Sequence, residues 1–131
     1  MNSRILTLDE RLEWVQPPSP VEAPTDEVLA ELLQECIFRS DNLANALEEI
    51  GVTNQLFDVL GECVVACGQF MAALSRGSYL EAQYGLICGE VCATVAGLCR
   101  KLPCDTSLQC ASICENCAGR IRSRYRPMTS N

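Results

Sequence analysis

The most constraining feature of the chain is the stretch from Cys88 to Cys117, which contains seven of its ten cysteines. Before Pro103, three cysteines follow one another at intervals of four and seven residues. After Pro103, another three follow at intervals of four and three residues. Such intervals keep side chains on one face of an α-helix. The stretch therefore predicts two helices, separated by a short break at Pro103, whose facing surfaces are lined with sulfur.

Composition excludes several classes of function. The chain has no histidine, which rules out Ser-His-Asp triads, Cys-His nucleophile pairs and metal sites built on imidazole. The cysteines have no evident base or oxyanion hole beside them, so we do not expect an enzyme. The formal net charge of −7 argues against nucleic acid as a partner. A length of 131 residues suffices for one domain with a core of its own.

The N-terminus shows no charged region followed by an apolar segment, so no signal peptide is expected. No apolar run reaches the roughly 18 residues of a membrane span, because Glu90 interrupts the longest candidate. We therefore expect a cytoplasmic protein without a membrane partner. Thiols stay reduced in the cytosol, where a cysteine-rich pattern more often indicates metal binding than disulfides.

Three regions are expected: an N-terminal Pro-rich extension (1–25), a helical domain (26–126) and a C-terminal tail (127–131). The extension is stiffened by four prolines, which should prevent a helix: Pro17, Pro18, Pro20 and Pro24. Its Leu12 and Trp14 either pack on the outside of the domain or dock to a subunit or protein partner. Near the other end lies a cluster of four arginines, Arg120, Arg122, Arg124 and Arg126. This cluster indicates either a solvated helix end favoured by the helix dipole or an anionic docking site.

Four helices are predicted within the domain, and local signals set their ends. The first helix should run from about 26 to 50, with a cap at Thr25 or Asp26 and an end at Gly51. The second should run from a cap at Thr53 to Gly77. The third should run from a Ser78–Glu81 capping box to Pro103, and the fourth from a cap at Asp105 or Thr106 to Pro127.

The inward faces of these helices repeat at alternating steps of four and three residues. The expected inward residues are Leu29, Leu33, Cys36, Ser40, Leu43, Leu47 and Ile50; Leu56, Leu60, Cys63, Cys67, Phe70 and Leu74; Tyr84, Cys88, Cys92, Val95, Cys99 and Leu102; and Cys110, Cys114, Cys117 and Ile121. This heptad pattern is typical of helices packed nearly parallel or antiparallel. Short turns make consecutive helices antiparallel neighbours. The fold class is therefore all-α, an up-down-up-down four-helix bundle with a cysteine-lined core.

Nine of the ten cysteines fall on these inward faces, and Cys104 alone lies in a turn. A rise of about 1.5 Å per residue places seven of them in one slab about 10 Å deep: Cys36, Cys63, Cys67, Cys88, Cys92, Cys114 and Cys117. Cys99, Cys104 and Cys110 continue the slab toward the end with the first and third turns. We expect the opposite half to be apolar, so that the bundle has one apolar half and one thiol half.

Three interpretations of such a core compete. Free cysteines can serve as small buried hydrophobes, but nine on one interior surface exceed what packing requires. Disulfides are disfavoured within one helix, where CxxxC spacing leaves Cβ atoms about 5–6 Å apart rather than about 3.8 Å. Disulfides between helices remain possible, because Cys63, Cys67, Cys88 and Cys92 form a pair of CxxxC motifs. The third interpretation is a metal site.

Soft thiolates select Cu(I), Zn(II) and iron–sulfur clusters. A zinc ion held by four thiolates keeps a net negative charge, which is costly to bury without a counter-ion. Cu(I) is monovalent, so a cluster with about one copper per thiolate is neutral and suits an apolar bundle better. Zinc stays an alternative, and an iron–sulfur cluster is the principal rival, because four inward cysteines at one height could hold one.

Two segments carry a resemblance to a known family. ALSRGSYLEAQYGLICGEVC, which begins at Ala73, and CASICENCAGRIR, which begins at Cys110, resemble the bacterial cysteine-rich copper storage proteins. The resemblance covers about residues 27–124 and implies a four-helix bundle that stores many Cu(I) ions and assembles as a homo-oligomer. It implies copper-binding thiolates at Cys63, Cys67, Cys88, Cys92, Cys99, Cys110, Cys114 and Cys117, with Cys36 as the sole ligand from the first helix.

The chain departs from that family in two ways. Members carry more cysteines, whereas comparable positions here hold Ser40, Leu43, Phe70 and Val95, and members often have a histidine that this chain lacks. A lower metal capacity follows. The predicted function is storage or buffering of Cu(I) by core cysteines, with Cys104 as a tenth candidate ligand; the alternative is an iron–sulfur or redox-active bundle.

Overall fold

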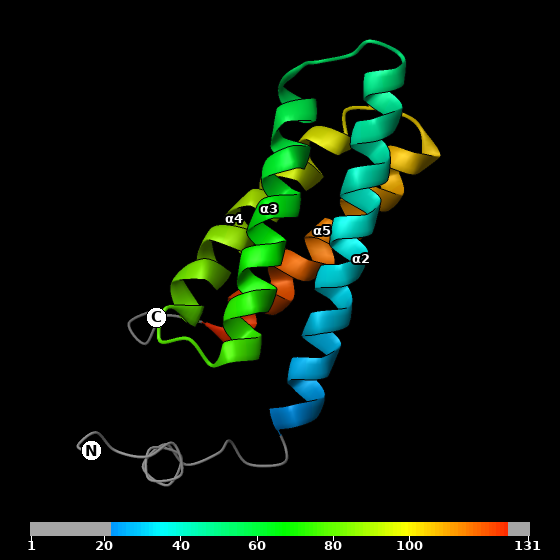
Figure 1. Cartoon of the computed structure of the whole chain (residues 1–131). Coiled ribbons are helices and arrows are strands. Elements are labelled where there is room, and N and C mark those ends of the chain that lie inside the picture. The colour runs from blue at the N-terminus through cyan, green and yellow to red at the C-terminus, as the bar shows by residue number, and fades with distance from the viewer. Residues whose placement is uncertain (1–21, 126–131) are drawn as a thin grey trace, which may run out of the picture.

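The protein is a bundle of four antiparallel helices in this computed structural model, which describes residues 22–125 and, from residue 27, their side chains. The helices are α2 (Glu22–Glu49), α3 (Gln55–Arg76), α4 (Glu81–Cys99) and α5 (Asp105–Arg124). Each packs against two neighbours, α2 and α4 both contacting α3 and α5 (Figure 1). The predicted all-α, up-down-up-down bundle is confirmed. The predicted roles of the N-terminal extension and the C-terminal tail concern residues that lie outside the described range.

Helix α2 begins earlier than predicted. Its first residue is Glu22, so Pro24 lies within the first turn. The prediction that Pro24 prevents a helix is wrong, because proline lacks only an N–H that the first turn leaves unbonded. Thr25 and Asp26 consequently lie inside the helix and do not precede it. Gly51 follows the helix with a left-handed φ of 78°, which confirms that the chain turns at this glycine.

Helix α3 has a side-chain cap one residue later than predicted. Asn54 is the N-cap, and its Oδ1 accepts a hydrogen bond of 3.1 Å from the backbone N–H of Phe57. The prediction of Thr53 as the cap is wrong. At the other end, Gly77 adopts a left-handed φ of 64° and donates its N–H to carbonyl groups of the last turn, which confirms the predicted end.

The predicted caps of α4 and α5 are also wrong. Ser78 Oγ accepts a hydrogen bond from the N–H of Leu80 at 3.1 Å, so it stabilises the turn and forms no capping box with Glu81. Glu81 instead accepts a hydrogen bond from the hydroxyl of Tyr125, the residue that follows α5. Helix α4 ends at Cys99, ahead of Pro103, and the N-cap of α5 is Cys104, which makes no side-chain capping bond.

Buried leucines line the core near the α2–α3 turn, and apolar residues line the opposite end. The leucines are Leu43, Leu47, Leu56 and Leu60, and the residues at the opposite end include Leu29, Leu33, Phe70 and Ile121. The prediction of one apolar half and one thiol half is therefore wrong: the thiols lie between two apolar ends. Ile50, predicted to face inward, is exposed because the helix has already ended at Glu49.

Two of the helices, α3 and α4, are long and apolar enough to cross a membrane by length and composition. The prediction concerned uninterrupted apolar runs, whereas these helices pass on their mean hydropathy although charged residues such as Asp58 and Glu90 interrupt them. The absence of a membrane partner therefore stays a prediction. Core helices of soluble bundles meet the same criterion, and in this structure both pack against two other helices.

Candidate metal centre

Nine cysteine side chains are completely buried between the helices. Helix α2 contributes Cys36; α3 contributes Cys63 and Cys67; α4 contributes Cys88, Cys92 and Cys99; and α5 contributes Cys110, Cys114 and Cys117. Their spacing by three, four or seven residues brings each set onto the inward face of its helix. The predicted inward placement of all nine is confirmed.

The sulfur of Cys36 lies at the centre of the group. It is 3.6 Å from the sulfur of Cys63, 3.7 Å from that of Cys92 and 3.4 Å from that of Cys114. These four residues belong to four different helices, and their sulfurs all lie within 4.8 Å of one another. A single cysteine on α2 thus completes a ring of four thiols.

A second group adjoins the first and shares Cys92 with it. The sulfur of Cys67 is 3.6 Å from that of Cys88, and both are 4.0 Å from the sulfur of Cys92. Cys63 and Cys67 are also 4.0 Å apart, which joins the two groups a second time. The six sulfurs form one continuous set, as a polynuclear centre with bridging thiolates requires. We call Cys36, Cys63, Cys67, Cys88, Cys92 and Cys114 the central sulfurs.

Three more buried thiols adjoin the central sulfurs. Interaction with Cys36 raises the pKa of Cys117, and interaction with Cys110 raises the pKa of Cys99. The sulfur of Cys110 is also 3.9 Å from the hydroxyl of Ser40. Cys104 differs from all of these, because it is exposed in the α4–α5 turn, with its sulfur 3.2 Å from the hydroxyl of Ser107.

All ten cysteines are free thiols. The central sulfurs approach to 3.4–4.0 Å, whereas a disulfide bond is about 2.05 Å long. The structure therefore offers a set of potential ligands and no disulfide framework.

Comparison with known proteins agrees with this geometry. The family model described as "Copper storage protein" matches residues 24–125, which include all four inward faces and all ten cysteines. The chain belongs to the copper storage protein family. Comparisons with curated proteins and with solved structures found no match. For a copper storage protein, the buried thiols are the groups to which a metal cargo would bind, and membership implies a storage role in place of catalysis.

Interactions between the thiols of this copper storage core shift their pKa values in both directions. Interaction with Cys114 lowers the pKa of Cys63 to about 5. Interaction with Cys114 instead raises the pKa of Cys92, and burial raises it further. A thiol that donates keeps its proton, while one that accepts is stabilised as a thiolate.

No basic side chain is buried in the described part of the protein, where the buried polar residues are Ser40 and Ser107. The arginines nearest in sequence to these thiols pair at the surface. Arg39 bonds to Glu35 and Gln109, and Arg100 forms an ion pair with Glu115. A buried charge is costly without a partner. Several thiolates in this core would therefore need bound cations to balance their negative charge.

One residue whose contacts the sequence did not reveal is Ser40, a completely buried hydroxyl among the sulfurs. Its Oγ donates a hydrogen bond of 3.5 Å to the sulfur of Cys63. The sequence did show that Ser40 lies on the inward face, one helical turn after Cys36, at a position where a cysteine could have stood.

Proposed function

We propose that the protein stores or buffers Cu(I), which binds as cargo to the thiolates of its core. The observation that carries this proposal is the continuous set of central sulfurs supplied by all four helices. The proposed ligands are the nine buried cysteines: Cys36, Cys63, Cys67, Cys88, Cys92, Cys99, Cys110, Cys114 and Cys117. The tenth predicted ligand, Cys104, would bind copper only at the surface of the bundle.

Charge balance favours Cu(I) over divalent metals. Each Cu(I) ion cancels the charge of one thiolate, and cuprous ions accept the bridging thiolates that a contiguous set of sulfurs supplies. Several zinc sites would leave negative charge inside a core whose described residues include no buried lysine or arginine. Membership in the copper storage family supports the same choice.

Cytoplasmic localisation and a homo-oligomeric state are parts of the same proposal. A store that depends on free thiols requires a reducing compartment, because oxidation to disulfides would remove its ligands. The ten free cysteines support this location. The oligomeric state rests on the family resemblance alone, and sedimentation of the loaded protein would determine it.

Anaerobic titration of the reduced full-length protein with Cu(I), in competition with a chromophoric Cu(I) chelator, tests the proposal. We expect several tightly bound equivalents and a colourless product, because a d10 ion has no d–d transitions. Uptake of fewer than about two tight equivalents would contradict a store made of bridged thiolates. A brown product carrying iron and acid-labile sulfide would favour the iron–sulfur alternative.

A matched pair of variants locates the ligands. Cys36→Ser removes the thiol that contacts three others, so we expect it to lower the number of tight equivalents by more than one. Cys104→Ser removes the exposed thiol and should cost at most about one equivalent. Equal losses in the two variants would show that the central sulfurs do not form the store.

A further inference from the structure

The inward face of α2 changes from thiol to hydroxyl at Ser40. This residue lies one helical turn after Cys36 and is completely buried. Its Oγ donates to Cys63 at 3.5 Å on one side and lies 3.9 Å from the sulfur of Cys110 on the other. Both partners are thiols that we propose as copper ligands, and they come from α3 and α5.

The position of Ser40 matches that of a ligand. Contacting pairs of central sulfurs lie 3.4–4.0 Å apart, and the hydroxyl of Ser40 lies at the same range from two sulfurs. A sulfur in place of this oxygen would extend the central group toward Cys110. The oxygen itself is a poor ligand for Cu(I), which selects soft sulfur donors.

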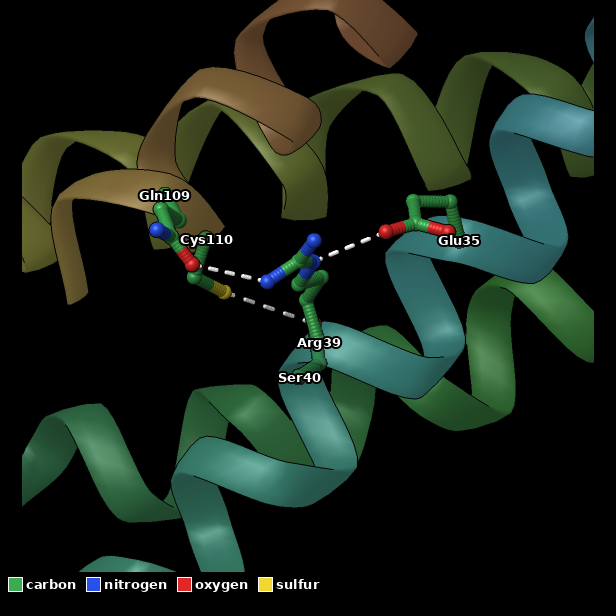
Figure 2. Close-up of polar contacts among 5 residues, drawn as sticks. All are labelled: Glu35, Arg39, Ser40, Gln109 and Cys110. Atoms are coloured by element: carbon green, nitrogen blue, oxygen red, sulfur yellow. Dashed lines mark hydrogen bonds and ion pairs between the residues drawn. The ribbon is translucent and has the colours of Figure 1, made fainter. Parts of the chain in front are cut away.

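A surface contact joins α2 and α5 beside Ser40. Arg39 Nη1 donates to Gln109 Oε1 at 2.7 Å, while Arg39 Nε pairs with Glu35 Oε2 at 2.8 Å (Figure 2). Arg39 precedes Ser40 on α2, and Gln109 precedes Cys110 on α5. The outer bond therefore joins the same two helices one residue away from the contact between Ser40 and Cys110.

We propose that Ser40 sets both the capacity and the affinity of the copper core at this end. Its oxygen occupies a position where a sulfur from α2 could bind copper, and its one hydroxyl proton is donated to the copper-bound thiolate of Cys63. A hydrogen bond to a ligand sulfur stabilises its negative charge and orients it, as partners of metal ligands do generally. The inference rests on the proposed copper-binding function.

The test compares three variants of the full-length reduced protein by anaerobic Cu(I) titration against a chelator. Ser40→Cys should gain about one tight equivalent over the wild type, because the new sulfur completes a site. Ser112→Cys adds a thiol on the exposed face of α5 and should gain none. Ser40→Ala should keep the wild-type number but weaken the last-filled copper about tenfold or more.

The two variants test the two roles of Ser40 separately. An unchanged capacity in Ser40→Cys would overturn the role in capacity, and an unchanged affinity in Ser40→Ala would overturn the role as hydrogen-bond donor. Circular dichroism confirms that each variant is helical, and Ser40→Ala decides the second role even if Ser40→Cys does not fold. If the wild type takes up fewer than about two equivalents, the copper function itself fails; if it takes up several and the variants match it, only this inference fails.

Discussion

Gly85 allows two aromatic rings to close the end of the bundle opposite the α2–α3 turn. A Cβ atom at this position would lie 2.7 Å from Tyr125 Cε2 and 3.0 Å from two ring atoms of Phe70. The rings of Phe70 and Tyr125 themselves meet edge to face, with centroids 5.9 Å apart. Nothing in the local sequence revealed this role, because a glycine inside a helix gives no sign of which ring crosses it.

Gly85→Ala should destabilise the protein by about 1–3 kcal/mol, because the added methyl group forces a well-packed ring pair apart. Gly97→Ala is the matched control on the same helix, where a Cβ meets no atom within 4 Å and the site is exposed. It should stabilise by up to about 1 kcal/mol through helix propensity. Urea unfolding of the two variants measures both values. The packing argument fails if both alanines have the same effect.

Tyr125 makes stability depend on alkaline pH. Burial, and then the hydrogen bond to Glu81, raise the pKa of Tyr125 to about 12 from its ordinary 10.0. A raised pKa favours the neutral form in the folded state, so the contribution is fully present below pH 10.0 and is lost as pH rises through about 12.

Tyr125→Phe should therefore be less stable than the wild type at neutral pH by about 1 kcal/mol, through the lost hydrogen bond. The difference should shrink as pH rises from 10.0 to about 12. Denaturant unfolding of the reduced proteins at a series of pH values measures it, and the thiols, common to both proteins, cancel in the comparison. A constant difference across this range would show that the hydroxyl does not titrate with folding.

At the scale of the helices, the sequence predicted which segments are helical and which of their faces point inward. It predicted less well where each helix begins and ends. Heptad steps depend on many residues, so most predicted inward residues are buried; Ile50 is exposed, and Leu74, Tyr84 and Leu102 are only partly buried. A cap depends on one side chain among several candidates. Thr53 and Asn54 both precede α3, and only the geometry of the turn selects Asn54.

Asn54→Ala should destabilise the protein by about 1 kcal/mol, because the N–H of Phe57 loses its acceptor at the exposed start of α3. Thr53→Ala changes the neighbouring residue that the sequence favoured, and it should have an effect within about 0.5 kcal/mol. Thermal or urea unfolding of the two variants provides the comparison. The reverse order of effects would restore Thr53 as the cap.

At the scale of the molecule, the number of cysteines predicted a thiol core, and the helical repeat predicted the bundle around it. The apolar ends were only half predicted. Leu43, Leu47, Leu56 and Leu60 were placed on the inward faces, yet the height of Cys99 and Cys110 suggested thiols at that end. Relative heights of helices depend on turn geometry, which one sequence specifies poorly.

These apolar ends should keep the metal-free protein folded, and copper should then stabilise it further. A ligand that binds only the folded state adds RT ln(1 + [L]/Kd), about 4 kcal/mol at a thousandfold excess over Kd. We expect the melting temperature to rise with each copper equivalent and to return to its original value when a chelator removes the metal. An apo protein without helical circular dichroism would contradict this expectation and indicate folding coupled to metal.

Cys104 is the one solvent-exposed thiol among the ten cysteines, so it offers a single site for chemical labelling. A maleimide dye added to the native reduced protein should attach at this sulfur well before the nine others, whose side chains no reagent reaches without helix opening. A fluorophore attached there would lie outside the core and would report copper binding without replacing a buried thiol. The rate at which the remaining thiols are labelled would then measure how often the helices separate.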